Sequence, residues 1–244
     1  MKLEGKVALV TGAARRVGRV IARALARRGA RVAIHYNRSR AEAEALAREL
    51  RDEFGREAMT ARAELSDVRA VRAMAEAVAG RFGGLQVLVN NASVYRKSAF
   101  GATSLEDWDD HLDANLRAPF FLCQAAAPYM RKGGGKIINI ADWAALRPYA
   151  DYIPYCVSKA GLLCLNTALA KQLAPEIQVN AIMPGPVLLP EGCTPRMRKA
   201  VERATPLRRL GTPEDIAEAA LFLIESGDFI TGAALPVDGG RLIA

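Results

Sequence analysis

Hydrophobic and polar positions form two kinds of segment that alternate along the whole chain. Short apolar runs are typical of strands buried on both faces, and longer segments with apolar residues every three or four positions are typical of amphipathic helices. The apolar runs predict strands at Lys6–Val10, Arg31–Tyr36, Ala58–Ala61, Leu85–Val89, Lys136–Ile140, Ile177–Ile182 and Ala234–Val237. The longer segments predict helices at Val17–Arg28, Ser39–Phe54, Val68–Phe82, Leu105–Met130, Pro154–Leu173, Thr194–Ala204 and Pro213–Ile224.

This alternation predicts an α/β fold in which helices cover both faces of a mostly parallel sheet of about seven strands. No Pro/Ser-rich linker, low-complexity tract or fixed-period repeat divides the chain, so we expect a single domain over residues 1–244. Ser39 precedes its helix and Glu42 follows three residues later, which is the pattern of a capping box. In such sheets a ligand binds beyond the carboxyl ends of the strands, so the residues just after each strand are functional candidates.

Composition and charge remove several classes of function. The chain is 51% hydrophobic and its formal net charge is +8. The arginines are spread over helix-like segments without interleaved aromatic residues, which argues against nucleic-acid binding. The first residues lack the long apolar core of a signal peptide, and we expect no later run to reach the length of a membrane span. We therefore expect a protein without nucleic-acid or membrane partners.

The cysteines and histidines give no sign of a metal or disulfide framework. None of the cysteines forms a C-x-x-C pair, so they are expected to be reduced core thiols of a cytoplasmic protein. They are Cys123, Cys156, Cys164 and Cys193. The two histidines, His35 and His111, are far apart and lack ligand spacing, so no metal site is expected.

A glycine-containing turn, Thr11–Gly18, joins the first predicted strand to the first predicted helix. Glycine permits a tight turn and lets backbone N–H groups approach a pyrophosphate at a helix N-terminus. The strand–turn–helix context strengthens this otherwise weak signal. Arg16 stands where a middle glycine is usual, either as a surface side chain or as a cation beside the phosphates.

The end of the second predicted strand indicates which dinucleotide would bind. It reads His35-Tyr-Asn-Arg-Ser39 and lacks the acid that usually bonds the adenosine ribose in an NAD site. An acid would repel a 2′-phosphate, whereas Arg38 and Ser39 would bind one, partly through charge-assisted bonds. If these residues only packed or stayed solvated, the ribose would lose its usual partner. The segment therefore favours NADPH over NADH.

The candidate chemistry lies in the second half of the chain. Tyr155 and Lys159 are four residues apart on a predicted helix, so both side chains can face one cleft. A phenol has a pKa of about 10. A neighbouring ammonium is expected to lower the Tyr155 pKa and suit the pair to acid–base work beside a hydride carrier. Asp142 stands thirteen residues before Tyr155, just after a predicted strand.

Several motifs occur in an order that identifies a family. They are Thr11-Gly12 to Gly18, Asn90-Asn-Ala-Ser93, Asn115, Tyr155 to Lys159, Pro184-Gly185 and Val237-Asp-Gly-Gly240. With them the sequence resembles the short-chain dehydrogenase/reductase family over nearly its whole length. The resemblance implies a Rossmann-type domain in a homotetramer. It also implies Tyr155 as the proton donor, Lys159 bonding the nicotinamide ribose and Asn115 holding a water for the proton relay.

Asp142 departs from the family pattern, because most members have a Ser that donates a hydrogen bond to a substrate carbonyl. An ionised Asp cannot donate, and it would repel a developing oxyanion. It suits a substrate that is protonated at a ring nitrogen or offers N–H groups, and burial could raise its pKa and make it a proton source. The pattern is similar to the pteridine reductase branch, which Arg16, the His35–Ser39 segment, Ser93 and Tyr95 also resemble.

That resemblance implies a pterin sandwiched between the nicotinamide and Tyr95. Ser93 and Arg16 would bond its polar edge, and the segment Val187–Pro195 would close over it. The implied cofactor contacts are Gly12, Arg16, Val17, Gly18, His35, Tyr36, Asn37, Arg38, Ser39, Glu64, Leu65, Asn91, Ala92, Ser93, Tyr155, Lys159, Pro184 and Gly185. The implied substrate contacts are Arg16, Ser93, Tyr95, Asp142, Tyr155, Leu188 and Leu189.

The sequence thus predicts an NADPH-dependent enzyme that transfers hydride to a C=N bond of a dihydropterin or dihydrofolate. Tyr155, assisted by Asp142 and Lys159, would supply the proton. Two other functions stay open: a 3-oxoacyl-carrier-type carbonyl reductase and a catalytically silent NADPH-binding regulator. Asp142 argues against the first. The retained Tyr155, Lys159 and Asn115 argue against the second, since a sensor needs no proton relay.

Overall fold

Seven strands form one parallel sheet within residues 1–189 and 192–244, the part of the chain that this computed structural model describes. They are β1 (Val7–Val10), β2 (Arg31–Tyr36), β3 (Ala58–Arg62), β4 (Val87–Asn90), β5 (Gly135–Ile140), β6 (Ile177–Pro184) and β7 (Ala234–Val237). Their order across the sheet is β3-β2-β1-β4-β5-β6-β7, and each neighbouring pair is parallel. The α/β prediction is confirmed, with the sheet wholly rather than mostly parallel.

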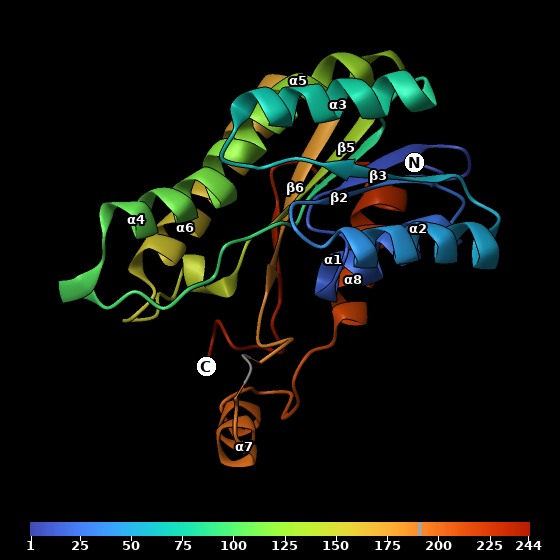
Figure 1. The fold of residues 1–244 in the computed structure, drawn as a ribbon. Coiled ribbons are helices and arrows are strands. Elements are labelled where there is room, and N and C mark those ends of the chain that lie inside the picture. Colours follow the sequence, from blue (N-terminus) through green and yellow to red (C-terminus); the bar gives the residue numbers. More distant parts are fainter. Residues whose placement is uncertain (190–191) are drawn as a thin grey trace.

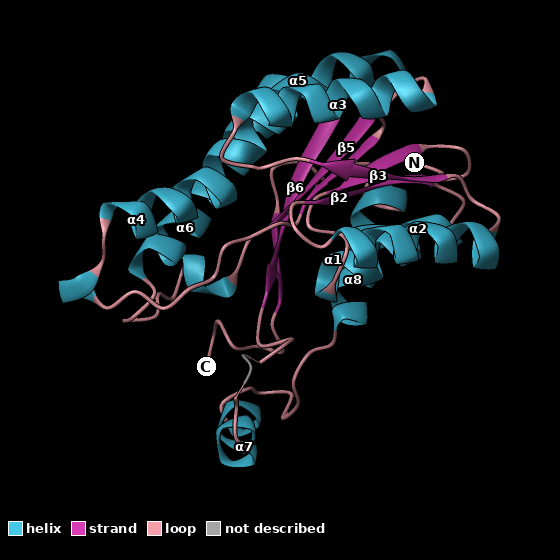
Figure 2. Cartoon of the chain, viewed as in Figure 1, coloured by secondary structure: helices cyan, strands magenta, loops and turns pink. Residues whose placement is uncertain are grey.

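Helices cover both faces of the sheet (Figures 1 and 2). α1, α2 and α8 pack on one face, and α3 and α5 pack on the other. The helices are α1 (Arg16–Arg27), α2 (Arg40–Phe54), α3 (Val68–Phe82), α4 (Leu105–Leu112), α5 (Ala118–Met130), α6 (Ile153–Leu173), α7 (Pro195–Arg203) and α8 (Pro213–Glu225). All four residues of β1 are buried because helices lie above and below that strand, which explains its uninterrupted apolar sequence.

The sheet has its switch point at β1, which pairs with β2 on one side and β4 on the other. Ala8 lies opposite Val32 in β2 and opposite Val87 in β4. The chain therefore leaves the end of β1 in one direction and the end of β4 in the other. Such a divergence opens a crevice beyond the carboxyl ends of the strands, where ligands bind in doubly wound folds.

The predicted helix Leu105–Met130 is interrupted. The structure has α4, then a π-helical turn at Asp113–Arg117, then α5. Pro119 lies in the first turn of α5 and has no N–H, so the Asn115 carbonyl cannot receive its usual bond from four residues on. A π-turn inside a helix often marks a functional position, and here it contains Asn115.

The predicted capping box at α2 does not form. Ser39 is the N-cap residue, but its side chain makes no capping hydrogen bond. The Glu42 carboxylate instead pairs with Arg15, in the turn before α1. An opposite charge is a stronger attraction for a carboxylate than a neutral backbone N–H. The box that does form joins Thr212 and Asp215 at the start of α8.

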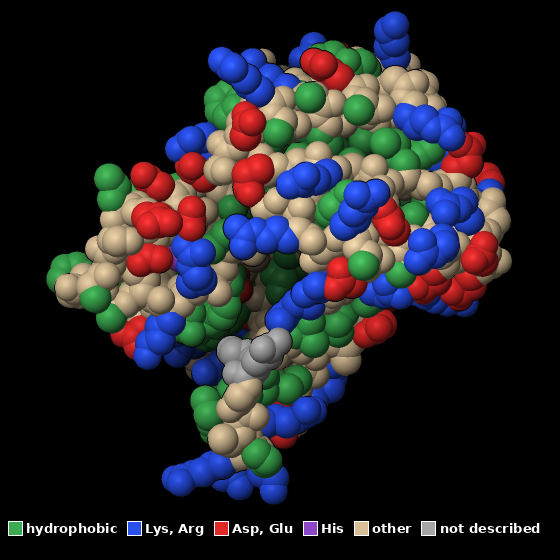
Figure 3. All heavy atoms as spheres, in the orientation of Figure 1, with side chains coloured by type: hydrophobic (Ala, Val, Ile, Leu, Met, Phe, Trp, Pro, Cys, Tyr) green, Lys and Arg blue, Asp and Glu red, His purple; other side chains and the backbone are tan. Residues whose placement is uncertain are grey.

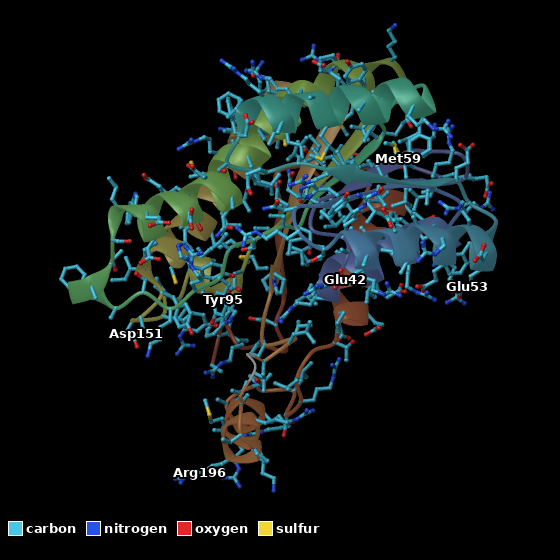
Figure 4. All side chains as sticks on the ribbon, in the orientation of Figure 1. Glu42, Glu53, Met59, Tyr95, Asp151 and Arg196 are labelled. Atoms are coloured by element: carbon cyan, nitrogen blue, oxygen red, sulfur yellow. The ribbon has the colours of Figure 1, made fainter. Side chains whose placement is uncertain are left out.

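Part of the positive charge is paired between α1 and α2. Arg19 pairs with Glu49, and Nη2 of Arg23 lies 2.8 Å from Oε2 of Glu53, which Figure 4 labels on α2. Partly exposed pairs of this kind contribute about 0–1 kcal/mol each. They account for some of the arginine content without an external partner.

Helix α6 corrects the expectation that no segment is long and apolar enough to span a membrane. Its 21 residues pass that test by length and composition, but half of the apolar window is buried inside the fold. Leu169 and Leu173 pack into the core on the face of the sheet that α3 and α5 cover. The helix is apolar because it packs against β6, and it carries Tyr155 and Lys159 into the cleft.

Two of the four cysteines are buried and two are not. All four are free thiols; Cys123 and Cys156 are buried, whereas Cys164 is exposed and Cys193 is partly exposed. The expectation of core thiols is therefore right for the first two. It is wrong for Cys164 because that residue lies on the outward side of α6, and for Cys193, which lies in the loop before α7.

Candidate active site

A cleft of about 960 Å³ lies beyond the carboxyl ends of the strands, and Figure 3 shows a hollow with Lys and Arg side chains on its rim. It contains most residues that the sequence predicts for the site. These are Gly12, Arg16, Val17, Gly18, His35, Asn37, Glu64, Leu65, Asn91, Ala92, Ser93, Tyr95, Asp142, Tyr155, Lys159, Pro184, Gly185, Leu188 and Leu189. Four others do not line it among the described residues: Tyr36, Arg38, Ser39 and Asn115.

The glycine turn is pressed against the end of β4. A Cβ on Gly18 would lie 2.4 Å from Nδ2 of Asn91 and 2.5 Å from the Gly12 carbonyl oxygen, closer than any side chain tolerates. Asn91 Nδ2 donates to the Thr11 carbonyl at 2.8 Å, which fixes this contact. The backbone at Arg16 has φ 54°, in the left-handed region that normally favours glycine. The turn therefore keeps a glycine-like shape while carrying a cation.

The His35 side chain supports the glycine turn through a hydrogen bond to its backbone. Its Nδ1 accepts a 3.0 Å hydrogen bond from the Gly12 N–H, so its Nε2 carries the proton and donates to the Ala63 carbonyl at 3.1 Å. Burial lowers the His35 pKa, in keeping with this neutral form. Both ring nitrogens are engaged, so His35 supports the turn rather than offering a free nitrogen to a ligand.

The end of the cleft beside the glycine turn, where the sequence predicts the nucleotide, contains a residue that the sequence did not reveal. Arg15 lines the cleft beside Arg16 and is exposed, with its guanidinium paired to Glu42. Asn37, at the end of β2, donates its side-chain N–H to Glu64. The only signal for Arg15 was its place in the glycine turn, where any exposed arginine looks alike in sequence.

The other end of the cleft, the chemical end, brings together three side chains: Asp142, which follows β5, and Tyr155 and Lys159, which both lie on α6. The Tyr155 hydroxyl, in the first turn of α6, donates to Oδ2 of Asp142 at 2.7 Å. The other oxygen of Asp142, which follows β5, accepts from the Ala144 N–H at 2.7 Å. Nζ of Lys159 donates to the Ile140 carbonyl at 2.8 Å and lies 5.8 Å from the Tyr155 ring centre. The twelve residues between Asp142 and Tyr155 thus fold back on themselves.

Burial governs the charges of this group. It raises the pKa of Asp142, with the Tyr155 hydrogen bond acting in the opposite direction. It lowers the pKa of Lys159 to about 8. The expected lowering of the Tyr155 pKa is wrong: burial and the neighbouring Asp142 raise it well above 10. Desolvation and an adjacent acid both oppose a phenolate, and they outweigh the ammonium.

Asn115 braces the loop on the opposite wall. It is buried, and its Oδ1 accepts from the Val94 N–H at 2.8 Å while its Nδ2 donates to the Val94 carbonyl at 2.9 Å and to Oγ of Ser158 at 3.0 Å. On the far side of Tyr95, Nε2 of His111 accepts from the Arg96 N–H at 3.3 Å. The backbone on both sides of Tyr95 is therefore held.

Aromatic rings form the wall around Asp142. Tyr95, labelled in Figure 4, stacks on Tyr152 with ring centres 4.7 Å apart and planes 9° apart, and meets Tyr155 edge-on at 4.7 Å. Trp143 meets Tyr149 edge-on at 5.4 Å. Sequence reasoning did not assign Tyr149 or Tyr152, because their roles depend on how the loop before α6 folds.

Known proteins share this architecture over nearly the whole chain. A family model described as enoyl-(acyl carrier protein) reductase matches residues 12–241. The chain belongs to the short-chain dehydrogenase/reductase family. It is 39% identical over 249 residues to D-threitol dehydrogenase of Mycolicibacterium smegmatis, covering 99% of this chain and 95% of that one. It is 35% identical to a 3-oxoacyl-(acyl-carrier-protein) reductase of Staphylococcus aureus, covering 96% and 97%.

Two solved members of the family have the same fold. A blue fluorescent protein from a metagenomic library, in complex with NADPH, superposes with a TM-score of 0.92 at 36% identity, covering 99% of each chain. A short-chain dehydrogenase of Burkholderia cenocepacia, in complex with NADP, gives 0.92 at 35% identity and the same coverage. This short-chain dehydrogenase/reductase is therefore an oxidoreductase by family. None of these four relatives is described as a pteridine reductase, so that branch stays a prediction.

Proposed function

We propose that this protein uses NADPH to reduce a C=N bond of a pterin, a dihydropterin or dihydrofolate. The observation that carries the proposal is the partly buried Asp142 carboxyl bonded to the Tyr155 hydroxyl at 2.7 Å, inside a wall of aromatic rings. An ionised acid at this position opposes a developing oxyanion, whereas a substrate that is protonated at nitrogen suits the acid whether it holds a proton or not. Flat aromatic walls suit a flat heterocycle.

The nucleotide end of the cleft fits NADPH. The first turn of α1 has neither a side-chain cap nor an acidic residue, so its backbone N–H groups are available to a pyrophosphate. Arg15 and Arg16 add positive charge beside it, and β2 ends without an acid that would repel a 2′-phosphate. Two similar structures contain NADPH or NADP. When bound, NADPH supplies the hydride; the chain's own residues supply the proton.

Asp142 and Tyr155 together suit that proton transfer. Because burial raises the Asp142 pKa, the acid holds a proton more tightly than a surface carboxyl does. A protonated Asp142 would donate to the Tyr155 oxygen, which frees the Tyr155 hydroxyl to donate to a ring nitrogen. Lys159 contributes a positive charge at neutral pH, since its pKa of about 8 lies above that pH. Asn115 would hold a water of the relay, as in the family pattern.

The remaining predicted contacts describe how a pterin would sit. Tyr95 would stack on the ring with the face that Tyr152 does not cover. Ser93 and Arg16 would bond its polar edge, and Leu188 and Leu189 would cover it. The expected closing segment, residues 187–195, includes 190 and 191, which lie outside the described residues.

A 3-oxoacyl-carrier-type carbonyl reductase is the second candidate, and the Staphylococcus aureus relative at 35% identity supports it. That reaction forms an oxyanion, and Asp142 can stabilise it only while it holds a proton, whereas the serine of most family members has a hydroxyl to donate at any ordinary pH. A silent NADPH-binding regulator is the third. This third function is disfavoured because a protein that only binds NADPH requires no buried proton donor, and this site contains Tyr155, Lys159 and Asp142.

The deciding experiment measures NADPH oxidation with dihydrobiopterin, dihydrofolate and a 3-oxoacyl thioester, using the wild type, Asp142→Ser and the matched control Asp151→Ser. Asp151 is an exposed acid outside the cleft, paired with Lys97. Turnover of a pterin that falls by about 10²-fold or more only in Asp142→Ser supports the proposal. Turnover of the thioester with silent pterins contradicts it, and binding of NADPH without turnover of any substrate favours the regulator.

We also propose the homotetramer and the cytoplasmic location that the family pattern implies. Apolar side chains stay exposed on adjacent helices, Phe120 and Tyr129 on α5 and Val157 on α6, as expected where subunits meet. Light scattering of the purified protein would measure the mass and contradict the tetramer if it gave that of a single chain.

A further inference from the structure

Arg241 lies at the substrate end of the cleft, although no motif points to it. It follows β7 in the C-terminal tail and lines the cleft together with Leu188, Leu189 and Val201 of α7. Its guanidinium carbon lies 5.2 Å from the centre of the Trp143 ring, directly beside Asp142 in sequence. The residue is therefore part of the wall that a substrate would meet.

The backbone of the tail keeps Arg241 in place. Both oxygens of Asp238 accept backbone bonds on either side of it, from the Gly240 N–H at 2.9 Å and from the Leu242 N–H at 2.6 Å. The Arg241 carbonyl also accepts from Nη1 of Arg147 at 3.2 Å. A side chain on such a fixed backbone is positioned before a ligand arrives, which lowers the entropic cost of binding.

The hydrogen-bonding capacity of Arg241 is only partly used. Nη1 donates to the Ala204 carbonyl, at the end of α7, at 2.6 Å. Within residues 1–189 and 192–244, Nε and Nη2 make no hydrogen bond and no carboxylate lies within 4.0 Å. A guanidinium has five N–H donors in a planar fork that fits a carboxylate or phosphate. The exposed Arg209, by contrast, donates to both oxygens of Asp215, through Nη1 and Nη2.

The cleft thus has two polar groups that a substrate can meet: the Asp142 carboxyl and the Arg241 guanidinium. Asp142 is partly buried and bonded to Tyr155, while Arg241 offers a cation over Trp143. A neutral flat ring satisfies only the first. A ring with N–H groups and an anionic tail satisfies both.

We infer that Arg241 is a specificity residue that binds an anionic group on the substrate tail, so that the substrate is a dihydropterin whose tail bears carboxylates. The inference rests on the proposed function and deepens it. It places folate-type substrates ahead of those with a neutral side chain.

The test compares KM and kcat for dihydrofolate, dihydrobiopterin and a dihydropterin whose side chain ends in a phosphate. The proteins are the wild type, Arg241→Gln, Arg241→Lys and the control Arg81→Gln. Arg81 is exposed in the last turn of α3, at the opposite ends of the strands. Arg241→Gln is expected to raise the KM for dihydrofolate by about 10- to 100-fold, with kcat little changed. The KM for dihydrobiopterin should change less than about threefold, because its tail has no charge for the guanidinium to bind.

Arg241→Lys should recover part of the dihydrofolate affinity, and Arg81→Gln should match the wild type. A preference for the phosphate-bearing substrate would keep the anion site but overturn the carboxylate assignment. Equal losses for charged and neutral tails would show that Arg241 only supports the Trp143 wall, which overturns the inference while leaving pterin reduction intact. No turnover of any pterin by the wild type would instead remove the proposed function, and the inference with it.

Discussion

The two ends of the cleft are built on different physical principles. At the nucleotide end, the backbone makes the site: a glycine turn held against β4 and an uncapped helix N-terminus, with exposed arginines at its edge. At the chemical end, buried and partly buried titratable side chains make the site, and aromatic rings surround them. The first end depends on shape and surface charge, the second on desolvation.

Desolvation has one common effect on the buried groups. It lowers the pKa of His35 and of Lys159 and raises those of Asp142 and Tyr155. Burial therefore moves each of the four toward its neutral form, because a charge is costly away from water. For His35 the result is a fixed tautomer that holds the glycine turn. For Asp142 and Tyr155 the result is a retained proton that can be passed on.

Tyr155→Phe should produce the largest effect and should act on the chemical end alone. The change removes the only hydroxyl bonded to Asp142 among the described residues and leaves the ring that Tyr95 contacts. We expect kcat to fall by about 10²- to 10⁴-fold, as for loss of a positioned acid. NADPH affinity, measured by fluorescence titration, should stay within about twofold. A comparable loss of NADPH affinity would mean that the two ends are not separable.

Gly18→Ala should damage the nucleotide end. The new Cβ would lie 2.4 Å from Nδ2 of Asn91, so the turn must move away from β4. We expect about 1–3 kcal/mol of destabilisation from the forced shift, together with weaker NADPH binding. Urea unfolding and fluorescence titration measure these two effects.

Gly80→Ala provides the matched control. Gly80 lies within α3 and a Cβ there meets nothing within 4 Å, so the substitution should stabilise the helix by about 0.5–1 kcal/mol. If both glycine variants behaved alike, the close approach at Gly18 would carry no functional weight.

Much of the fold could be predicted because it depends on local patterns. β2, α3 and β7 have the predicted bounds, since each is an apolar or amphipathic run that ends at turn residues. The interruption at Asp113–Arg117 was missed, because the helical spacing of apolar residues continues through it. The only sequence signal for the interruption is Pro119, which has no N–H. The capping box predicted at Ser39 does not form because Glu42 pairs with Arg15, which lies 27 residues earlier in the sequence. A local sequence pattern does not show that contact.

The site could be predicted only where motifs carry it. Asp142, Tyr155 and Lys159 were identified from spacing and family pattern, and the structure brings them into contact. The direction in which the Tyr155 pKa shifts was not predictable, because burial cannot be read from the spacing of residues. Tyr149 and Arg241 were missed, because they reach the cleft from a loop and from the C-terminal tail.

Asp142→Asn should give a smaller effect on stability, with a definite pH dependence. In the wild type the folded state binds the Asp142 proton more tightly than the unfolded chain does, since burial raises the folded pKa. This contribution favours folding below the ordinary carboxyl pKa and is lost as pH rises through the raised one. Asparagine has no such titration, so the variant should gain on the wild type as the pH rises from the ordinary carboxyl pKa, about 4, to the raised pKa of the folded state. The gain is about 1.4 kcal/mol for each unit by which the pKa is raised.

Urea unfolding of both proteins at several pH values measures this difference, and Asp215→Asn provides a control of opposite sign. The Arg209 guanidinium lowers the Asp215 pKa to about 2, so removing that acid should cost stability at neutral pH, by a small amount since the pair is exposed. A pH-independent difference for Asp142→Asn would mean that the Asp142 pKa is the same in the folded and unfolded states. Lys159 titrates the other way at higher pH: its pKa of about 8 makes the unfolding free energy rise between about pH 8 and its ordinary value.

Arg16→Gly should give the smallest effect and sharpen the comparison at the nucleotide end. Arg16 has φ 54°, and glycine adopts this conformation without steric cost, so the variant should be more stable by up to about 1 kcal/mol. It also loses a cation at the cleft, so NADPH binding should weaken several-fold, most at low salt. Arg208→Gly is the matched control: its φ is 55°, it lies outside the cleft, and it should show the stability gain alone. If both variants bound NADPH equally well, the turn would act at that position through its backbone shape, and the charge of Arg16 would be available to the substrate instead.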